Sequence, residues 1–218
     1  MESTGLVRAF RIFVAVAALF YFLEVLVSEP ERFFLRPKFL TIWGLYGSLI
    51  VAFLMLGRSF GVITRRFDGF VSMVIVLNIL VVFLYWRLYL EDPSLVNSGD
   101  PIAWWKEYYL HLLCEILMWI DAFFIFGAWR KIWSGLAWLF AAIIGYVSLI
   151  ELYFKPRNDE PVGEVTSGLP YPFLNDMELV ERFGFYGTTA VTGFVFAGIT
   201  ILLAIFLRKF LNVPRASA

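Results

Sequence analysis

The chain has 218 residues, of which 61% are hydrophobic and 19% aromatic, whereas only 17% are charged and the formal net charge is zero. This composition is too apolar for a soluble globular protein of this size, and it offers no basic surface for binding nucleic acid. It indicates a chain whose solvent is lipid.

Six long apolar runs predict transmembrane helices in chain order: Arg8 to Val27, Phe39 to Leu56, Phe70 to Leu90, Tyr108 to Gly127, Ile132 to Phe154, and Phe183 to Leu207. Each run supplies the ~20 apolar residues that a helix needs to cross the hydrocarbon layer. Their continuous apolarity excludes the alternating pattern of a barrel strand. The sequence therefore predicts an all-α fold, a single membrane domain of six transmembrane helices over residues 1–218.

The loops and termini differ in charge from one side of the membrane to the other. One side collects the basic residues Arg8, Arg11, Arg58, Arg65, Arg66, Arg130, Lys131, Arg208, Lys209 and Arg215. The other side is mixed to acidic, with Glu29, Glu31, Glu91, Asp92, Asp100, Asp159, Glu160, Glu164, Asp176, Glu178 and Glu181. Because positive charge marks the cytoplasmic side, both termini are predicted to be cytoplasmic. The membrane would be the inner membrane in a bacterium, or the endoplasmic reticulum or another endomembrane in a eukaryote.

Six ionisable side chains interrupt the apolar runs: Glu24, Arg87, His111, Glu115, Asp121 and Glu151. A charge at the bilayer centre costs about 2.5 to 3.5 kcal/mol on insertion scales, so each one calls for an explanation. The predicted threading places Glu24, Arg87 and Glu151 near the exoplasmic ends of three spans, where snorkelling to water explains each residue singly. Together with His111 and Thr41 they predict a polar site that opens toward the outer leaflet.

His111 is the only histidine in the chain and lies about one turn inside the fourth run. It is suited to accept and return a proton, although a neutral histidine hydrogen-bonded to a neighbouring helix explains it equally well. Glu115, one helical turn further on, would either orient the imidazole or pair with it. Thr41 lies near a predicted helix start at Pro37, where backbone N–H groups without intrahelical acceptors would stabilise an oxyanion.

Three segments carry a resemblance to a known family. They are Lys38-Phe39-Leu40-Thr41, Leu110-His111 with Asp121 ten residues later, and Gly168-Leu169-Pro170-Tyr171-Pro172-Phe173-Leu174. In this order and spacing the chain resembles the androgen-induced protein/androgen-dependent TFPI-regulating protein (FAR-17a/AIG-like) family of six-span membrane hydrolases, and at least as much its bacterial relatives, the Pr6Pr membrane proteins.

The resemblance implies a threonine hydrolase of lipid esters, whose animal relatives cleave fatty acid esters of hydroxy fatty acids. It implies that Thr41 is the nucleophile, that His111 is the catalytic histidine, and that Tyr171 belongs to a loop covering the site. Asp121 matches an acidic position to which no chemistry is assigned. Two residues depart from the family pattern: Glu115 stands where relatives often have proline, and Trp43 where many bacterial relatives are polar.

A second class of function uses the same residues differently. A small transporter or ion pathway would use the intramembrane acids and His111 as polar relays. Arg87 would attract a free carboxylate in an enzyme or would simply snorkel. No cofactor is predicted, because a single histidine and the single cysteine, Cys114, provide neither a metal-ligand pair nor a haem site. The predicted partner is a lipid ester in the membrane.

Overall fold

The structure is a computed structural model that describes residues 4–28, 37–96, 103–157, 169–171 and 173–210. Within these residues the chain is helical and contains no strand. Six helical spans are long and apolar enough to cross a membrane: Gly5–Val27, Leu40–Ser59, Asp68–Glu91, Trp104–Phe126, Ile132–Arg157 and Leu179–Phe210. All six predicted spans are therefore confirmed, with boundaries that shift by a few residues at either end.

Three spans are single helices at the N-terminal side of the chain: α1 (Gly5–Ser28), α2 (Leu40–Ser59) and α3 (Asp68–Glu91). The fourth span is composite, because α4 (Trp104–Tyr108) and α5 (Cys114–Ile120) alternate with two π-helical segments, η3 (Tyr109–Leu113) and η4 (Asp121–Phe126). The remaining elements are η2 (Pro93–Leu95), α6 (Ile132–Ser148), the π-helical η5 (Leu149–Phe154), η6 (Lys155–Arg157), α7 (Phe173–Asp176) and α8 (Leu179–Phe210).

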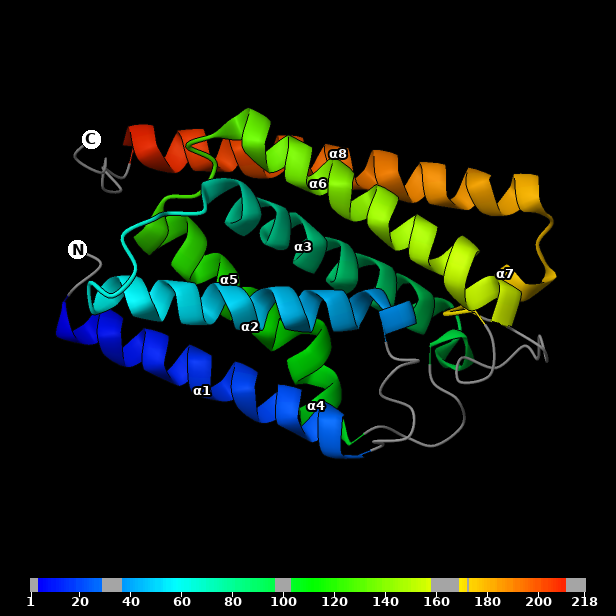
Figure 1. The fold of residues 1–218 in the computed structure, drawn as a ribbon, viewed down its shortest axis with the longest axis horizontal. Helices are drawn as coiled ribbons and strands as arrows, with labels where there is room; N and C mark the ends of the chain where they lie inside the picture. Colours follow the sequence, from blue (N-terminus) through cyan, green and yellow to red (C-terminus); the bar gives the residue numbers. More distant parts are fainter. Residues whose placement is uncertain (1–3, 29–36, 97–102, 158–168, 172, 211–218) are drawn as a thin grey trace.

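Helix α3 occupies the centre of the bundle and is the most buried of the six spans. Figure 1 shows α1 and α2 on one side of it and α6 and α8 on the other, with the α4 to α5 span behind. Both termini lie at the same end, which we call the proximal end, together with the loops that follow α2 and precede α6. The opposite end, with α4 and α7, is the distal end. That the proximal end is cytoplasmic stays a prediction.

Close packing of α3 against α6 depends on a glycine at the start of α3. A Cβ atom on Gly69 would lie 2.2 Å from Ser134 Oγ, 2.8 Å from Trp138 Cδ1 and 2.9 Å from the backbone carbon of Ser134. The last contact is with backbone, which a rotamer change does not relieve. Small residues let helices approach closely in membranes, where tight packing rather than the hydrophobic effect drives association.

We expect Gly69→Ala to lower the free energy of unfolding by about 1 to 3 kcal/mol, the usual cost of overpacking. The measurement is unfolding of the purified protein by sodium dodecyl sulfate, followed by circular dichroism. Gly198→Ala in α8 is the matched control, because a Cβ atom there would meet nothing within 4 Å. Alanine is also the better helix former at that position, so equal destabilisation by both variants would contradict the packing argument.

Arginines satisfy backbone carbonyl groups at the proximal end. Arg8 Nε donates to the Ser59 carbonyl at 3.1 Å, Arg66 to the Phe126 carbonyl at 2.7 Å, and Arg208 to the Ala128 carbonyl at 2.8 Å. The last carbonyls of a helix have no intrahelical donor, so the contacts to Ser59 and Phe126 stabilise the ends of α2 and η4, while Ala128 lies just beyond η4. Part of the basic charge that the sequence assigned to topology therefore also holds the bundle together.

Arg11 belongs to the basic residues that the sequence assigned to one side of the membrane, but it does not face solvent. Only 1% of its surface is exposed. Its guanidinium forms a forked ion pair with Asp121, with N···O distances of 2.6 and 2.7 Å, and also donates to the Met55 carbonyl and Ser59 Oγ. One turn deeper than Arg8, it lies beyond the reach of water, so burial requires a paired anion. Asp121 supplies that anion, which explains this intramembrane acid structurally.

Candidate active site

Three of the intramembrane ionisable residues lie in π-helical segments. His111 is in η3, Asp121 is at the start of η4, and Glu151 is in η5. In η3 the Cys114 N–H bonds to the Tyr109 carbonyl, five residues back rather than four. Single π-helical turns within longer helices are frequent at functional sites. The local departure from α-helix therefore coincides with the polar residues of the fourth and fifth spans.

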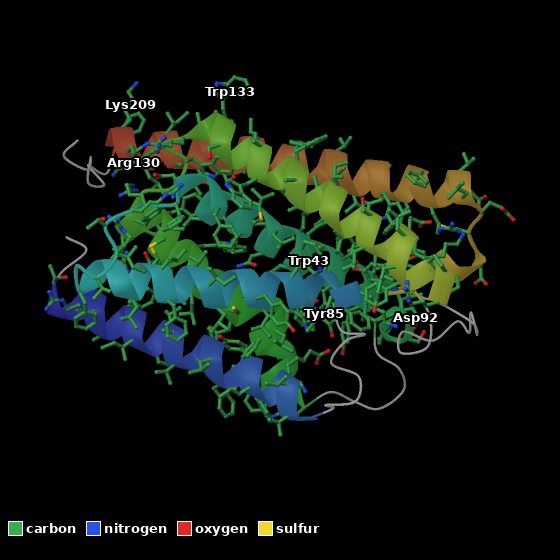
Figure 2. All side chains as sticks on the ribbon, in the orientation of Figure 1. Trp43, Tyr85, Asp92, Arg130, Trp133 and Lys209 are labelled. Atoms are coloured by element: carbon green, nitrogen blue, oxygen red, sulfur yellow. The ribbon has the colours of Figure 1, made fainter. Side chains whose placement is uncertain are left out.

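His111 is buried and held on two sides at the distal end of the bundle. Its ring stacks on Tyr85 of α3, with the centroids 3.4 Å apart and the planes 4° from parallel. Its Nδ1 lies 3.0 Å from the Glu107 carbonyl oxygen. The Tyr85 hydroxyl donates to the Glu107 carboxylate, and Figure 2 marks Tyr85 in the distal half of the bundle. The stack on Tyr85 therefore fixes the plane of the imidazole ring, and the contact with Glu107 fixes which way Nδ1 points.

The contact with Glu107 also determines which nitrogen carries the proton. A carbonyl oxygen only accepts hydrogen bonds, so Nδ1 must be the protonated nitrogen of the neutral ring. Nε2 then carries a lone pair. Within the described residues Nε2 has no hydrogen-bond partner. This is the tautomer in which a histidine acts as a general base through Nε2, with a backbone carbonyl in the place that an aspartate occupies in serine triads.

Thr41 is half-buried on the face of α2 that meets α3. On that face, one turn and two turns further along, a Cβ atom at Gly44 would lie 3.4 Å from Val81, and Ser48 accepts a 2.9 Å hydrogen bond from Asn78. Because α2 and α3 run in opposite directions, this register brings Thr41 level with Tyr85, one turn beyond Val81. Thr41 and His111 therefore both lie beside the same turn of α3. No hydrogen bond joins their side chains.

The backbone N–H of Thr41 lacks a hydrogen-bond acceptor among the described residues. In a regular helix it would donate to the Pro37 carbonyl, but that oxygen accepts from Trp43 Nε1 at 2.8 Å. No described residue accepts from the Thr41 N–H. The helix begins at Leu40, after Phe39 in an extended conformation, and not at Pro37 as the sequence predicted. The unbonded N–H groups consequently lie beside Thr41 itself rather than a turn before it.

No hydrogen bond joins Glu115 to His111. The predicted contact assumed an unbroken α-helix, in which residues four apart share a face, but the π-helical turn of η3 interrupts it. The position of orienting acceptor is taken instead by the Glu107 carbonyl. Glu115 is buried, and its Oε2 atom has no hydrogen-bond partner within the described residues. Tyr85 and Glu107 are the residues around His111 that sequence reasoning missed.

The polar side chains that the sequence predicted to meet at the distal end form two separate groups in the structure. Glu24 of α1 forms an ion pair with Lys106 of α4 at 2.9 Å, and Lys106 lies in the same span as His111. Glu151 pairs instead with Arg182 of α8 at 3.0 Å and accepts from the Tyr186 hydroxyl at 2.8 Å. Arg182 was missed because it directly precedes the sixth apolar run. No ion pair joins the two groups within the described residues.

On the side of the bundle that holds α6 and α8, Tyr171 borders two neighbouring cavities and Arg87 borders one of them. A small apolar central cavity of about 60 Å³, bordered by Leu40, Trp43, Leu80, Tyr146, Tyr171 and Tyr186, lies between α2, α3, α6 and α8. A more polar cavity of about 400 Å³ between α3 and α8 is bordered by Arg87, Glu91, Tyr171 and Thr188. Gly168 and Pro172 of the predicted covering loop lie outside the described residues.

The fold and these buried polar groups define a multi-pass membrane protein with a histidine positioned at one end of its bundle. Residues 5–206 match the family model described as FAR-17a/AIG1-like protein, and the chain belongs to that family. The family that the sequence resembles is thereby confirmed. No curated protein and no solved structure gives a significant match.

Proposed function

We propose that the protein is an intramembrane threonine hydrolase that cleaves lipid esters such as fatty acid esters of hydroxy fatty acids, with Thr41 as nucleophile and His111 as general base and acid. The observation that carries the proposal is the fixed tautomer of His111, whose Nδ1–H is committed to the Glu107 carbonyl. Family membership supports it, as does the position of Thr41 beside the same turn of α3. Asp121 has a structural partner and takes no part.

In the first half of the reaction, Nε2 of His111 takes the Thr41 hydroxyl proton as the oxygen attacks the ester carbonyl. The negative charge on the tetrahedral intermediate is stabilised by the Thr41 N–H, which has no acceptor among the described residues. The ester bond then breaks, and His111 returns the proton to the departing alcohol. In the second half, water gives its proton to His111 and attacks the acyl-threonine. The bond to the Thr41 oxygen then breaks, His111 returns the proton to that oxygen, and the fatty acid is released.

The location suits an amphiphilic substrate. Thr41 and His111 lie at the distal end of the spans, where acyl chains remain among the helices while water reaches the carbonyl. A non-enzymatic transporter is the second candidate. It would require the intramembrane acids to act as relays, but Asp121 is committed to Arg11 and Glu151 to Arg182. These pairs favour the hydrolase.

We expect Thr41→Ala to lower hydrolysis of a branched fatty acid ester by at least about a thousandfold, because the attacking oxygen is lost. Thr41→Ser keeps that oxygen and should retain measurable turnover. The experiment uses detergent-purified protein, and acid-quenched samples are digested to find the peptide that carries an acyl group by mass spectrometry.

Acylation of the Thr41 peptide in the parent protein and its absence from Thr41→Ala would support the proposal. The same acyl turnover in Thr41→Ala and the parent would reject Thr41 as nucleophile. Proteoliposomes made from the same preparations test proton flux, and flux that persists in Thr41→Ala while hydrolysis is absent from every preparation would favour the transporter.

A further inference from the structure

Asn78, on the central helix α3, has a side-chain oxygen without a hydrogen-bond partner. The residue is buried, with 0% of its surface exposed. Its Nδ2 atom donates to Ser48 Oγ of α2 at 2.9 Å, whereas Oδ1 has no partner within the described residues. An amide oxygen accepts two hydrogen bonds, and leaving it buried without a donor is costly. Such an atom calls for a bound water or another donor that completes it.

The contacts around Asn78 fix the direction of Oδ1. Ser48 accepts from Nδ2 and is also hydrogen-bonded to the Cys114 thiol of the fourth span, so this half of the amide is committed. Oδ1 lies instead against Gly44, one turn of α2 closer to the distal end, where a Cβ atom would be only 3.1 Å from it. Because glycine has no Cβ, the oxygen stays uncovered on this face of α2.

The same face of α2 carries Thr41, one further turn toward the distal end. Residues three apart on a helix have Cβ atoms about 5 to 6 Å apart, so a water on Oδ1 at Gly44 lies next to the Thr41 side chain. The ring of His111 stacks on Tyr85, which follows Asn78 by two turns on the same face of α3. Thr41 therefore has His111 level with it and the uncovered Asn78 oxygen one turn deeper in the membrane.

We propose that Asn78 positions the water that attacks the acyl-threonine, an inference that rests on the proposed function. The water donates one hydrogen bond to Oδ1 of Asn78 and the other to Nε2 of His111. As its oxygen attacks the acyl carbon, its proton passes to Nε2; the bond to the Thr41 oxygen then breaks, and His111 returns the proton to that oxygen. Asn78 accepts a hydrogen bond and neither gains nor loses a proton. Because no water attacks during acylation, its effect is confined to the second half of the reaction.

The two halves of the reaction are measured separately in the purified protein. A short pulse of isotope-labelled branched ester is chased with unlabelled ester, and acid-quenched samples give the label on the Thr41 peptide by mass spectrometry. We expect Asn78→Leu to slow loss of the acyl group by at least about tenfold, while release of alcohol in the first turnover stays within about threefold of the parent. Gly44→Ala keeps the amide but places a methyl group against Oδ1, so it should also slow acyl loss.

Two further variants control for a purely structural effect. Asn78→Asp keeps an oxygen in the position of Oδ1 and should lose the acyl group at nearly the parent rate. Ser72→Ala removes an equally buried polar group from α3, the acceptor of the Trp129 N–H at 3.1 Å, and should do the same. Acyl loss at the parent rate in both Asn78→Leu and Gly44→Ala, or equal slowing of alcohol release and acyl loss, would overturn the role of Asn78 and leave Thr41 as nucleophile. Absence of an acylated Thr41 peptide from the parent would overturn the proposed function and this inference with it.

Discussion

Replacing Asp121 by leucine is expected to lower the free energy of unfolding by about 3 to 5 kcal/mol, because it leaves the Arg11 guanidinium buried without its anion. The two side chains share a forked contact with 1% of Arg11 and 3% of Asp121 exposed, so water cannot replace the lost partner. Arg11 retains the Met55 carbonyl and Ser59 Oγ, which satisfy its donors but not its charge. The measurement is unfolding by sodium dodecyl sulfate, followed by circular dichroism.

The double variant Arg11→Met/Asp121→Leu provides the comparison. Replacing both members of a buried ion pair by apolar residues of similar volume is often neutral or stabilising. We therefore expect the double variant to recover most of the lost stability and to retain ester hydrolysis. If the double variant folds but loses hydrolysis, Asp121 has a chemical role beyond its ion pair. If it is no more stable than Asp121→Leu, the destabilisation does not come from the unpaired arginine.

The six spans were predictable because their signal is local and repeated. About twenty consecutive apolar residues have few ways to satisfy their backbone in lipid, and the helix is the one that needs no partner strand. The placement of His111 and Thr41 at the same end also followed from threading six spans in alternation. Both observations depend on counting residues along the chain, which needs no knowledge of side-chain contacts.

The surroundings of His111 were not predictable in the same way. The π-helical turn at Tyr109–Leu113 has no sequence signature that separates it from an α-helix, and the prediction of Glu115 as orienting residue assumed α-helical spacing. Tyr85 reaches His111 from another span, and Glu107 contributes a backbone carbonyl, which no residue type identifies. The burial of Arg11 was not predictable for a related reason, because a charge near a span end is normally a topology signal.

We expect His111→Gln to lower ester hydrolysis by roughly 10²- to 10⁴-fold, the range of a lost general base. Glutamine preserves a side chain of comparable reach but has no group that accepts a proton near neutral pH. The ring stack with Tyr85 is lost as well, so stability must be measured beside turnover. Initial rates of ester hydrolysis, with folding verified by circular dichroism, check the expectation.

Glu115→Gln is the matched control, since it lies in the same span, is equally buried and forms no hydrogen bond with His111. It should retain turnover within a fewfold of the parent. Tyr85→Phe keeps the aromatic face under the imidazole and removes only the hydroxyl that contacts Glu107, so its turnover should lie between the two. If Glu115→Gln were as inactive as His111→Gln, the carboxylate would orient the imidazole during the reaction, and the Glu107 carbonyl would not be sufficient to hold the tautomer.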